Sequence, residues 1–548
     1  MSGDDSSSRT IVFGFDALDF RYLDRYRESL PNFERLREGG FEAPLRSTHP
    51  PWTGSAWPSM YTGVDPSYHG AYGFFRYDGY PDQGELISRA DVAAPAIWDF
   101  LSTEGVPSVV LNVPITHPAE PIEGVMIPGY IAQETVSGHP SGIREEVSGA
   151  IDEQYRIYSH AEKSSDGEER LKGYLDLIDT RKQAAKYLVR EKEWEFAFVQ
   201  VQKTDAVVHN FDDDAAFRQV YEAADDLMGT VLEEIAEPVN VIVCSDHGIG
   251  PVRGHRIFVN ELLRRGGYLE TTEGGATPSL GGRKSELVGE TVDDDRDESW
   301  ATQMLSTVVD TLGRAGITPG RVYRTTTSLG VPPAVFKRLP EALVDATSKQ
   351  VDWRQSRAYC RRHTRLGIRI NLEGREPDGV VAPSEYEQVQ REIVDLLERV
   401  ETPDGQPAFD SVVRRQEFYD GPLADHGPDV VVRPRDMDNS LSDSLYGGEF
   451  VGVDKHDHKL DGVFVASGPA FDEDFEAERL SLTDVAPVVL AAMGRPVPER
   501  MTGTAPRDLL AASVRVRRFD DVPYARGSLH DQSSDGEVTE RLEDLGYL

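Results

Sequence analysis

Hydrophobic residues along the chain form short continuous runs that alternate with longer segments of helical spacing. Residues 10–16, 196–202 and 239–244 are dominated by β-branched and other apolar side chains, which is typical of buried strands. Residues 173–190 and 215–234 are amphipathic at helical spacing and lead into the second and third of these runs. This alternation predicts an α/β fold with a largely parallel central sheet.

The second half of the chain has a less regular pattern. Residues 383–400 and 482–493 read as helices, and residues 429–433 and 462–467 read as strands. Residues 299–352 look mainly helical. We divide the chain into a disordered N-terminus (1–8), a first part of the α/β core (9–265), an insertion or cap (266–380), a second part of the core (381–511) and a polar, loosely held tail (512–548).

Carboxylates and imidazoles follow the predicted strands. Asp16 ends the first strand, and Asp246-His247 follows the run at 239–244 after one residue, Ser245. Asp205 and His209 follow the strand at 196–202 and share a helical face if a helix begins there. The carboxyl edge of an open α/β sheet is where ligands bind, and Asp with neutral His commonly binds zinc. Taken singly, Asp246-His247 fits a solvated turn equally well, and most isolated pairs with the spacing of Asp205 and His209 are an N-terminal Asp with a chance His.

Thr53 lies in a loop rich in turn residues. Pro50-Pro51 disfavours a helix before it, and the residues from Thr53 onward can open one. Backbone N–H groups at a helix N-terminus attract anions such as phosphate, and a hydroxyl there can be a nucleophile if a metal lowers its pKa. The alternative, a simple N-cap, is the commoner role of threonine.

A third imidazole can come from the acidic loop before the strand at 462–467, which contains His456 and His458. With His458 chosen, the candidate set is Asp16, Thr53, Asp205, His209, Asp246, His247 and His458. The six carboxylates and imidazoles are enough to give each of two metal ions three protein ligands, with the Thr53 hydroxyl between the ions. Such a pair can polarise a phosphoryl oxygen, deprotonate a nucleophile and stabilise an in-line displacement.

Charge and cysteine content narrow the possible partners. The 548 residues contain 58 Lys plus Arg against 95 Asp plus Glu, a formal net charge of -37, so we expect no nucleic-acid-binding surface and no membrane contact through a basic face. An anionic substrate then needs metal ions as its local positive charge. Two cysteines, an acidic start and the lack of an apolar run of about 20 residues favour a soluble cytoplasmic protein without disulfides. The excess of acidic over basic residues suggests a protein that is kept soluble in a salt-rich cytoplasm.

Five motifs in order resemble the type I phosphodiesterase/nucleotide pyrophosphatase family of the alkaline phosphatase superfamily. They are FGFDALD (13–19), THPPWTGSAWPSMYTGVDPSYHG (48–70), KTDAVVH (203–209), SDHG (245–248) and HKLDG (458–462). The resemblance covers most of residues 9–510. It implies a three-layer αβα sandwich with a mainly helical insertion, and a hydrolase of small phosphodiesters or related phosphate esters.

The resemblance also implies a role for each candidate. Thr53 would be the nucleophile and would form a phosphothreonyl intermediate. One divalent ion, zinc or alternatively manganese, would be held by Asp205, His209 and His458. The other would be held by Asp16, Asp246 and His247, with Thr53 close to it. His458 is chosen over His456 because the family's histidine precedes its glycine by four residues, as His458 precedes Gly462.

One departure and two alternatives bear on the reaction. Nucleotide pyrophosphatases of the family follow the threonine with Phe-Pro-Asn, whereas this chain has Gly54-Ser55-Ala56, so nucleotide recognition does not follow from the likeness. A phosphomonoesterase on the same fold stays open, whereas a sulfatase would need a C/S-x-P-x-R motif that the chain lacks. A non-catalytic metal-binding scaffold is the third possibility, although it has no need of Thr53. The sequence indicates no oligomeric state.

Overall fold

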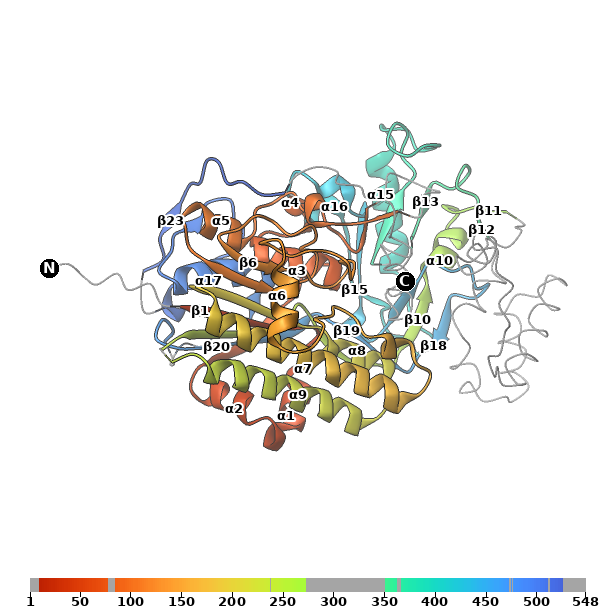
Figure 1. Cartoon of the computed structure of the whole chain (residues 1–548). Coiled ribbons are helices and arrows are strands. Elements are labelled where there is room, and N and C mark those ends of the chain that lie inside the picture. The colour runs from red at the N-terminus through yellow and green to blue at the C-terminus, as the bar shows by residue number, and fades with distance from the viewer. Residues whose placement is uncertain are drawn as a thin grey trace, which may run out of the picture.

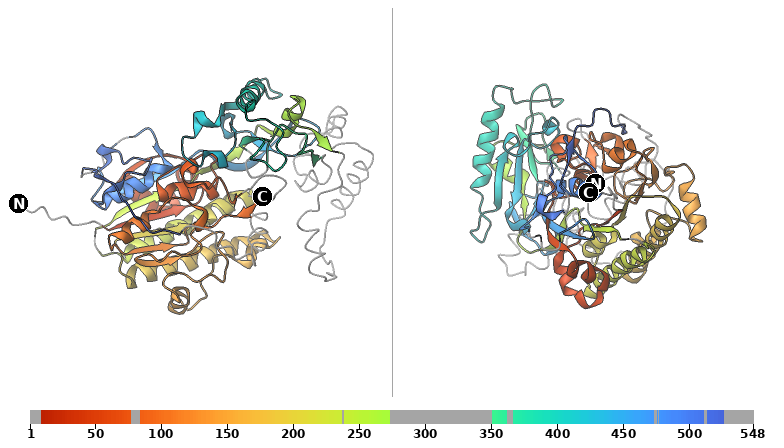
Figure 2. Two further views of the ribbon diagram at one scale, coloured as in Figure 1. Left: turned by 90° about the horizontal axis from the view of Figure 1, so that it is seen from above. Right: turned by 90° about the vertical axis from the view of Figure 1, so that its left-hand side faces the viewer.

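A computed structural model describes residues 9–76, 84–236, 238–272, 350–361, 366–472, 475, 477–510 and 513–525. Its larger lobe consists of one central sheet with helices on both faces (Figure 1). A smaller lobe lies beside it and contains the elements coloured green to teal (Figure 2). Within these ranges, no helix combines the length and the apolar character needed to cross a bilayer.

The central sheet has eight strands among the described residues. In spatial order they are β21 (Leu480–Ser481), β2 (Phe41–Arg46), β20 (Asp461–Ser467), β8 (Asn240–Cys244), β1 (Thr10–Phe15), β7 (Phe196–Val201), β5 (Ser108–Leu111) and β6 (Gly124–Ile127). β20 pairs antiparallel with both of its neighbours, and the other pairs in the sheet are parallel. The sheet is therefore mixed but mostly parallel, which confirms the predicted α/β class.

Helices cover both faces of this sheet (Figure 1). One face carries α1 (Phe20–Arg25), α2 (Pro31–Glu38), α7 (Gly167–Glu191) and α9 (Asp214–Glu233), and the other carries α3 (Thr53–Thr62), α5 (Ile97–Thr103) and α17 (Val485–Ala492). α6 (Ile143–Ala150) packs on α7, and the short α4 (Pro66–His69) follows α3. The result is the three-layer arrangement expected of the chain.

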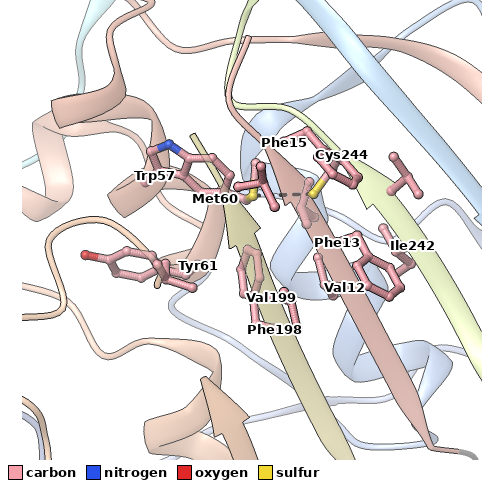
Figure 3. Packing of buried hydrophobic residues seen from close by; sticks show 14 of the residues in the cluster. Val12, Phe13, Phe15, Trp57, Met60, Tyr61, Phe198, Val199, Ile242 and Cys244 are labelled. Carbon is pink, nitrogen blue, oxygen red and sulfur yellow. Dashed lines mark hydrogen bonds between the residues drawn. The ribbon is translucent and has the colours of Figure 1, made fainter. Parts of the chain in front are cut away.

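The core between α3 and the sheet is closely packed (Figure 3). Trp57, Met60 and Tyr61 of α3 are buried against the central strands, and the sulfur atoms of Met60 and Cys244 lie 3.6 Å apart. Gly14 of β1 makes room for this contact, because a Cβ there would lie 2.6 Å from the Trp57 ring. Helix α3 is thereby pressed against β1, and its first residue is fixed near the end of that strand. Cys244 and Cys360 are buried, and neither forms a disulfide bond among the described residues.

The smaller lobe is built on a second sheet. Its strands, in the order β13 (Ala358–Tyr359), β14 (Gly367–Ile370), β16 (Val430–Pro434) and β15 (Phe409–Arg414), pair antiparallel, and α15 (Tyr386–Glu398) packs on them. A three-stranded sheet of β17 (Ser440–Ser442), β10 (His255–Phe258) and β18 (Phe450–Gly452) adjoins α10 (Val259–Arg265). Strands on both sides of residue 380 share one sheet, and the segment boundaries drawn from the sequence stay a prediction.

Two expectations need correction or fall outside the described residues. Most of the segment predicted to be mainly helical (299–352) lies outside them, and its described end, Gln350–Val351, is a strand (β12) paired with β11 (Thr271–Thr272). The start of the tail is docked rather than loosely held. Its strand β23 (Val516–Arg517) pairs with β22 (Val497–Pro498), and the Phe519 and Phe100 rings lie 5.2 Å apart.

Candidate functional site

The strands that carry the candidate residues end at one edge of the central sheet. In the parallel register, Phe15 of β1 lies opposite Val201 of β7, and Gly14 lies opposite Cys244 of β8. Asp16, the segment leading to Asp205, and Asp246 therefore leave the sheet side by side. The antiparallel strand β20 starts at this same edge, and the strand before it, β19 (Lys455–Lys459), contributes His458.

The turn after β1 fixes Asp16 against Asp246. Ala17 has a left-handed backbone conformation with φ 53°, which is uncommon for a residue with a Cβ. In this conformation its N–H donates to Asp246 Oδ1 at 3.1 Å. The hydroxyl of Thr204 donates to the carbonyl of Asp16 at 2.5 Å and ties the turn to the neighbouring helix. The strained turn therefore holds two buried carboxylates close together.

Thr53 is the first helical residue of α3, and Trp52 occupies the N-cap position. The structure thus does not use Thr53 as the N-cap, the alternative considered from the sequence. The Thr53 hydroxyl lies 3.4 Å from Asp16 Oδ1, and Trp57, one turn later, donates its indole N–H to Asp16 Oδ2 at 3.3 Å. Helix α3 therefore brings a buried hydroxyl and a hydrogen-bond donor to the same carboxylate.

Helix α8 (Lys203–Asn210) begins where the sequence predicted. Asp205 and His209 stand one turn apart on it, and His209 Nε2 lies 3.2 Å from Asp205 Oδ1. His458 reaches the same carboxylate from β19, with 3.6 Å between its Nε2 and Asp205 Oδ1. These three residues, predicted as one ligand set, are adjacent.

His247 joins the two predicted ligand sets. Strand β19 pairs with β9 (Gly248–Val252), so that His458 lies opposite Ile249 and its ring stacks on that of His247 with 4.0 Å between centroids. His247 Nε2 lies 3.2 Å from Asp246 Oδ2 and 3.6 Å from Asp16 Oδ1. The structure therefore brings all seven candidates into one cluster.

The second ring nitrogen of two histidines contacts a backbone carbonyl. His247 Nδ1 lies 3.1 Å from the carbonyl oxygen of Gly248, and His458 Nδ1 lies 3.1 Å from that of Pro51. A neutral imidazole that donates from Nδ1 keeps the Nε2 lone pair for a metal, and this orientation is usual around metal-binding histidines. In both residues Nε2 is the atom that faces the carboxylates.

Burial and like charges shape the pKa values of the carboxylates. Burial, followed by repulsion from Asp246 and Asp205, raises the pKa of Asp16 well above its usual range. Burial also raises the pKa of Asp246 to about 7. Burial would raise the pKa of Asp205 too, but the imidazoles, His209 first, hold it below its ordinary value. Three buried carboxylates this close call for positive charge.

The three histidines of the cluster do not together supply this positive charge. Burial lowers the pKa of His247 to about 4 and that of His458 to about 3, so both are neutral at physiological pH. Only His209 in this cluster has a raised pKa, because the attraction of Asp205 outweighs its burial. Neutral imidazoles beside ionised carboxylates form the donor set that divalent cations such as zinc prefer.

Two groups of these donors can each hold a metal ion. Ligand atoms of Asp205, His247 and His458 lie within 4.8 Å of one another, and so do those of Asp16, Asp246 and His247. Asp246 Oδ2 and His247 Nε2 are buried and make no hydrogen bond among the described residues. A cation between them would satisfy both atoms, so the residues present fit the metal ions that the family resemblance implies.

Sequence reasoning missed the residues that orient these donors. Trp57 had a usable signal, because it stands four positions after Thr53 and therefore on the same face of a predicted helix. Ala17 and the carbonyls of Pro51 and Gly248 gave none, since their roles depend on backbone conformation.

Comparisons with known proteins agree with this architecture. Ectonucleotide pyrophosphatase/phosphodiesterase family member 3 of Rattus norvegicus is 23% identical over 254 residues, which are 45% of this chain and 25% of that protein. This chain thus spans about a quarter of the length of that relative. Phosphonoacetate hydrolase from Sinorhizobium meliloti 1021, in complex with phosphonoformate, has 16% sequence identity and a TM-score of 0.51, covering 89% of this chain and 96% of that one. Its complex with phosphonoacetate matches with 15% identity and the same TM-score.

The structural likeness shows a shared alkaline phosphatase-like fold, and the sequence comparison shows the family. The sequence profile described as type I phosphodiesterase / nucleotide pyrophosphatase matches residues 10–307, more than half of the chain. The matched range includes six of the seven clustered candidates, and His458 follows later in the chain. The chain therefore belongs to the type I phosphodiesterase/nucleotide pyrophosphatase family of hydrolases, within the alkaline phosphatase superfamily.

Proposed function

We propose that the protein hydrolyses phosphodiesters or related small phosphate esters, with Thr53 as the nucleophile and two divalent cations as cofactors. The observation that carries the proposal is the convergence of Thr53 with two buried Asp/His donor groups at one edge of the sheet. The relative from Rattus norvegicus is named as a pyrophosphatase/phosphodiesterase, and that name supports the ester class without fixing the substrate.

In the proposed reaction, Thr53 attacks phosphorus. Its hydroxyl releases its proton to solvent and its oxygen forms the new O–P bond while the bond to the leaving oxygen breaks, and the leaving group takes a proton from solvent. Water then attacks the phosphothreonyl group, which releases the product and restores the hydroxyl. Thr53 opens the ten-residue helix α3, whose positive N-terminal end favours the anionic phosphoryl group.

The other candidates are assigned to the two cations. Asp16, Asp246 and His247 would hold one ion beside Thr53, and Asp205, His209 and His458 would hold the other. When bound, zinc or manganese would lower the pKa of the hydroxyl and neutralise the charge that develops on phosphorus. His247 belongs geometrically to both donor groups. We assign it with Asp16 and Asp246 because its Nε2 lies within 3.6 Å of both carboxylates, and because His209, 3.2 Å from Asp205, completes the other set.

The test is hydrolysis of bis-p-nitrophenyl phosphate by the zinc- or manganese-loaded protein. Thr53→Ala should lower kcat by about a thousandfold or more, because it removes the attacking atom. Thr62→Ala is the matched control, since Thr62 is also buried in α3 but its hydroxyl only donates to the carbonyl of Pro58. A Thr53→Ala variant with parental activity would contradict the assignment of the nucleophile.

The leaving group is a separate question with its own experiment. The metal-loaded protein would be assayed in parallel with monoester, diester, pyrophosphate and sulfate substrates. The proposal expects the highest kcat/KM on a diester. A strong preference for monoesters would instead identify the phosphomonoesterase alternative, and turnover of none of them would favour a metal-binding scaffold.

A further inference from the structure

A small polar cavity lies beside the metal-site cluster, between the sheet and helix α7. It has a volume of about 10 Å³, on the scale of a single water molecule. Its polar wall comes from Asn112, Tyr130, Arg181, Gln202 and Lys203, and its apolar lining comes from Ile157, Leu177, Ile178 and Val201. None of these side chains belongs to the ligand sets assigned above, so the cavity needs its own explanation.

Arg181 brings a buried positive charge to this cavity. Its side chain is 4% exposed, and among the described residues it makes no ion pair with a carboxylate. Its terminal nitrogens donate to the backbone carbonyls of Arg156 and Ile157. Its Nε is buried without a hydrogen bond. A buried guanidinium with one unused donor is costly unless an acceptor of negative charge reaches it.

Gln202 and Lys203 add two further donors to the same wall. The ammonium group of Lys203 lies 3.1 Å from Glu162 Oε2 and 3.5 Å from Gln202 Oε1. The amide oxygen of Gln202 faces Lys203, so the amide nitrogen of Gln202 points away from the lysine. This nitrogen, Nε2, is buried and has no hydrogen-bond acceptor among the described residues. The Lys203–Glu162 pair is neutral as a unit, so among the described residues it leaves Arg181 without a carboxylate partner.

We propose that this cavity binds one chloride ion, held by Arg181 Nε and Gln202 Nε2 with the Lys203 ammonium nearby. The two unused N–H donors and the buried guanidinium match a small anion, which accepts hydrogen bonds and has no hydrogen of its own to donate. The cavity size excludes phosphate, carboxylates and other polyatomic anions. A water molecule is the competing guest, because the unbonded Oδ1 of Asn112 also lines the wall and can accept a hydrogen bond from it.

The position of the site gives it a structural consequence. Gln202 precedes α8 and Lys203 is its first residue, two positions before Asp205. An ion bound to both Arg181 and Gln202 would link α7 to the start of α8. Chloride should therefore stabilise the fold that presents Asp205 and His209, whether or not the proposed reaction takes place.

Bromide replaces chloride and can be located directly. Crystals of the metal-loaded protein grown in sodium bromide should show an anomalous peak in this cavity, about 3.3 Å from Arg181 Nε and Gln202 Nε2. A water molecule in the cavity, with no anomalous peak, would overturn the proposal. This readout does not depend on catalysis, so failure of the proposed function would leave it intact.

Thermal unfolding provides the second test. The metal-loaded protein should have a higher Tm in sodium chloride than in sodium gluconate at the same concentration, because gluconate is too large for the cavity. At chloride ten times the Kd, the folded population gains about elevenfold. Gln202→Leu should lose most of this gain, whereas Gln219→Leu on the exposed surface of α9 should keep it. An equal chloride effect in Gln202→Leu, or an equal effect of gluconate, would refute the site.

Discussion

Replacing Asp246 by asparagine should change stability in opposite directions with and without metal. Asp246 is buried, and its Oδ2 lies 3.2 Å from His247 Nε2 without a hydrogen bond between them. An amide in this position can donate to the neutral imidazole while its oxygen still accepts from the N–H of Ala17. The substitution therefore removes a buried charge, which should stabilise the metal-free protein.

The magnitude follows from the pKa of Asp246. Burial raises it from its ordinary 3.8 to about 7, which corresponds to a cost on the order of 4 kcal/mol for ionising this carboxyl in the folded state. Because the folded state holds the proton more tightly than the unfolded state, the metal-free parent loses stability as the pH rises from about 4 to about 7. The advantage of Asp246→Asn should be complete at pH 8 and less than half as large at pH 5.

Metal should reverse this order. A cation that binds the folded protein stabilises it by mass action. The Asp246 carboxylate then binds the cation, and its buried negative charge no longer destabilises the fold. Urea unfolding at pH 8 should find Asp246→Asn more stable than the parent after EDTA treatment and less stable in saturating zinc.

The matched control is Asp225→Asn. Asp225 is also buried, but both of its oxygens accept hydrogen bonds, Oδ1 from the backbone N–H groups of Asn32 and Phe33 and Oδ2 from the side-chain amide of Asn32. An asparagine amide nitrogen in place of either oxygen would face a donor. Its replacement should destabilise the protein with and without metal. If Asp246→Asn is less stable than the parent in both conditions, the electrostatic account of this cluster is wrong.

Three further predictions concern residues around the site. Trp57→Phe removes the indole donor to Asp16 and should lower kcat on bis-p-nitrophenyl phosphate about tenfold with little change in KM; parental kinetics would contradict its positioning role. Gly14→Ala places a Cβ 2.6 Å from the Trp57 ring and should cost about 1–3 kcal/mol in urea unfolding, whereas Gly149→Ala meets no atom within 4 Å and should cost nothing. Burial lowers the pKa of His69 to about 3, below the unfolded value of about 6.5, so the protein should lose stability as the pH falls below 6.5. His69→Gln should remove up to about 1.4 kcal/mol per pH unit from that slope, and an unchanged slope would contradict the assignment.

The strands and the residues that follow them could be predicted because both signals are local. Runs of apolar residues identified β1 and β8, and the first carboxylate after each strand, Asp16 and Asp246, lies at the sheet edge. The spacing of Asp205 and His209 was sufficient to place them on one face of a helix. These inferences needed only the periodicity of side chains along the backbone.

The partners of each strand could not be predicted in the same way. Residues 429–433 and 462–467 have similar apolar patterns, yet β16 belongs to the smaller lobe and β20 to the central sheet. Pairing depends on contacts between distant segments that periodicity does not encode. For the same reason, the position of His247 between both donor groups emerged only from the pairing of β19 with β9.

The central claim is that seven side chains from distant parts of the chain form one site for two cations beside a hydroxyl. Diffraction data at the zinc absorption edge, from crystals of the zinc-reconstituted protein, test it most directly. We expect two anomalous peaks, one beside Asp16 and Asp246 and the other beside Asp205 and His458. The absence of zinc from this cluster, or a single ion at full zinc saturation, would contradict the account.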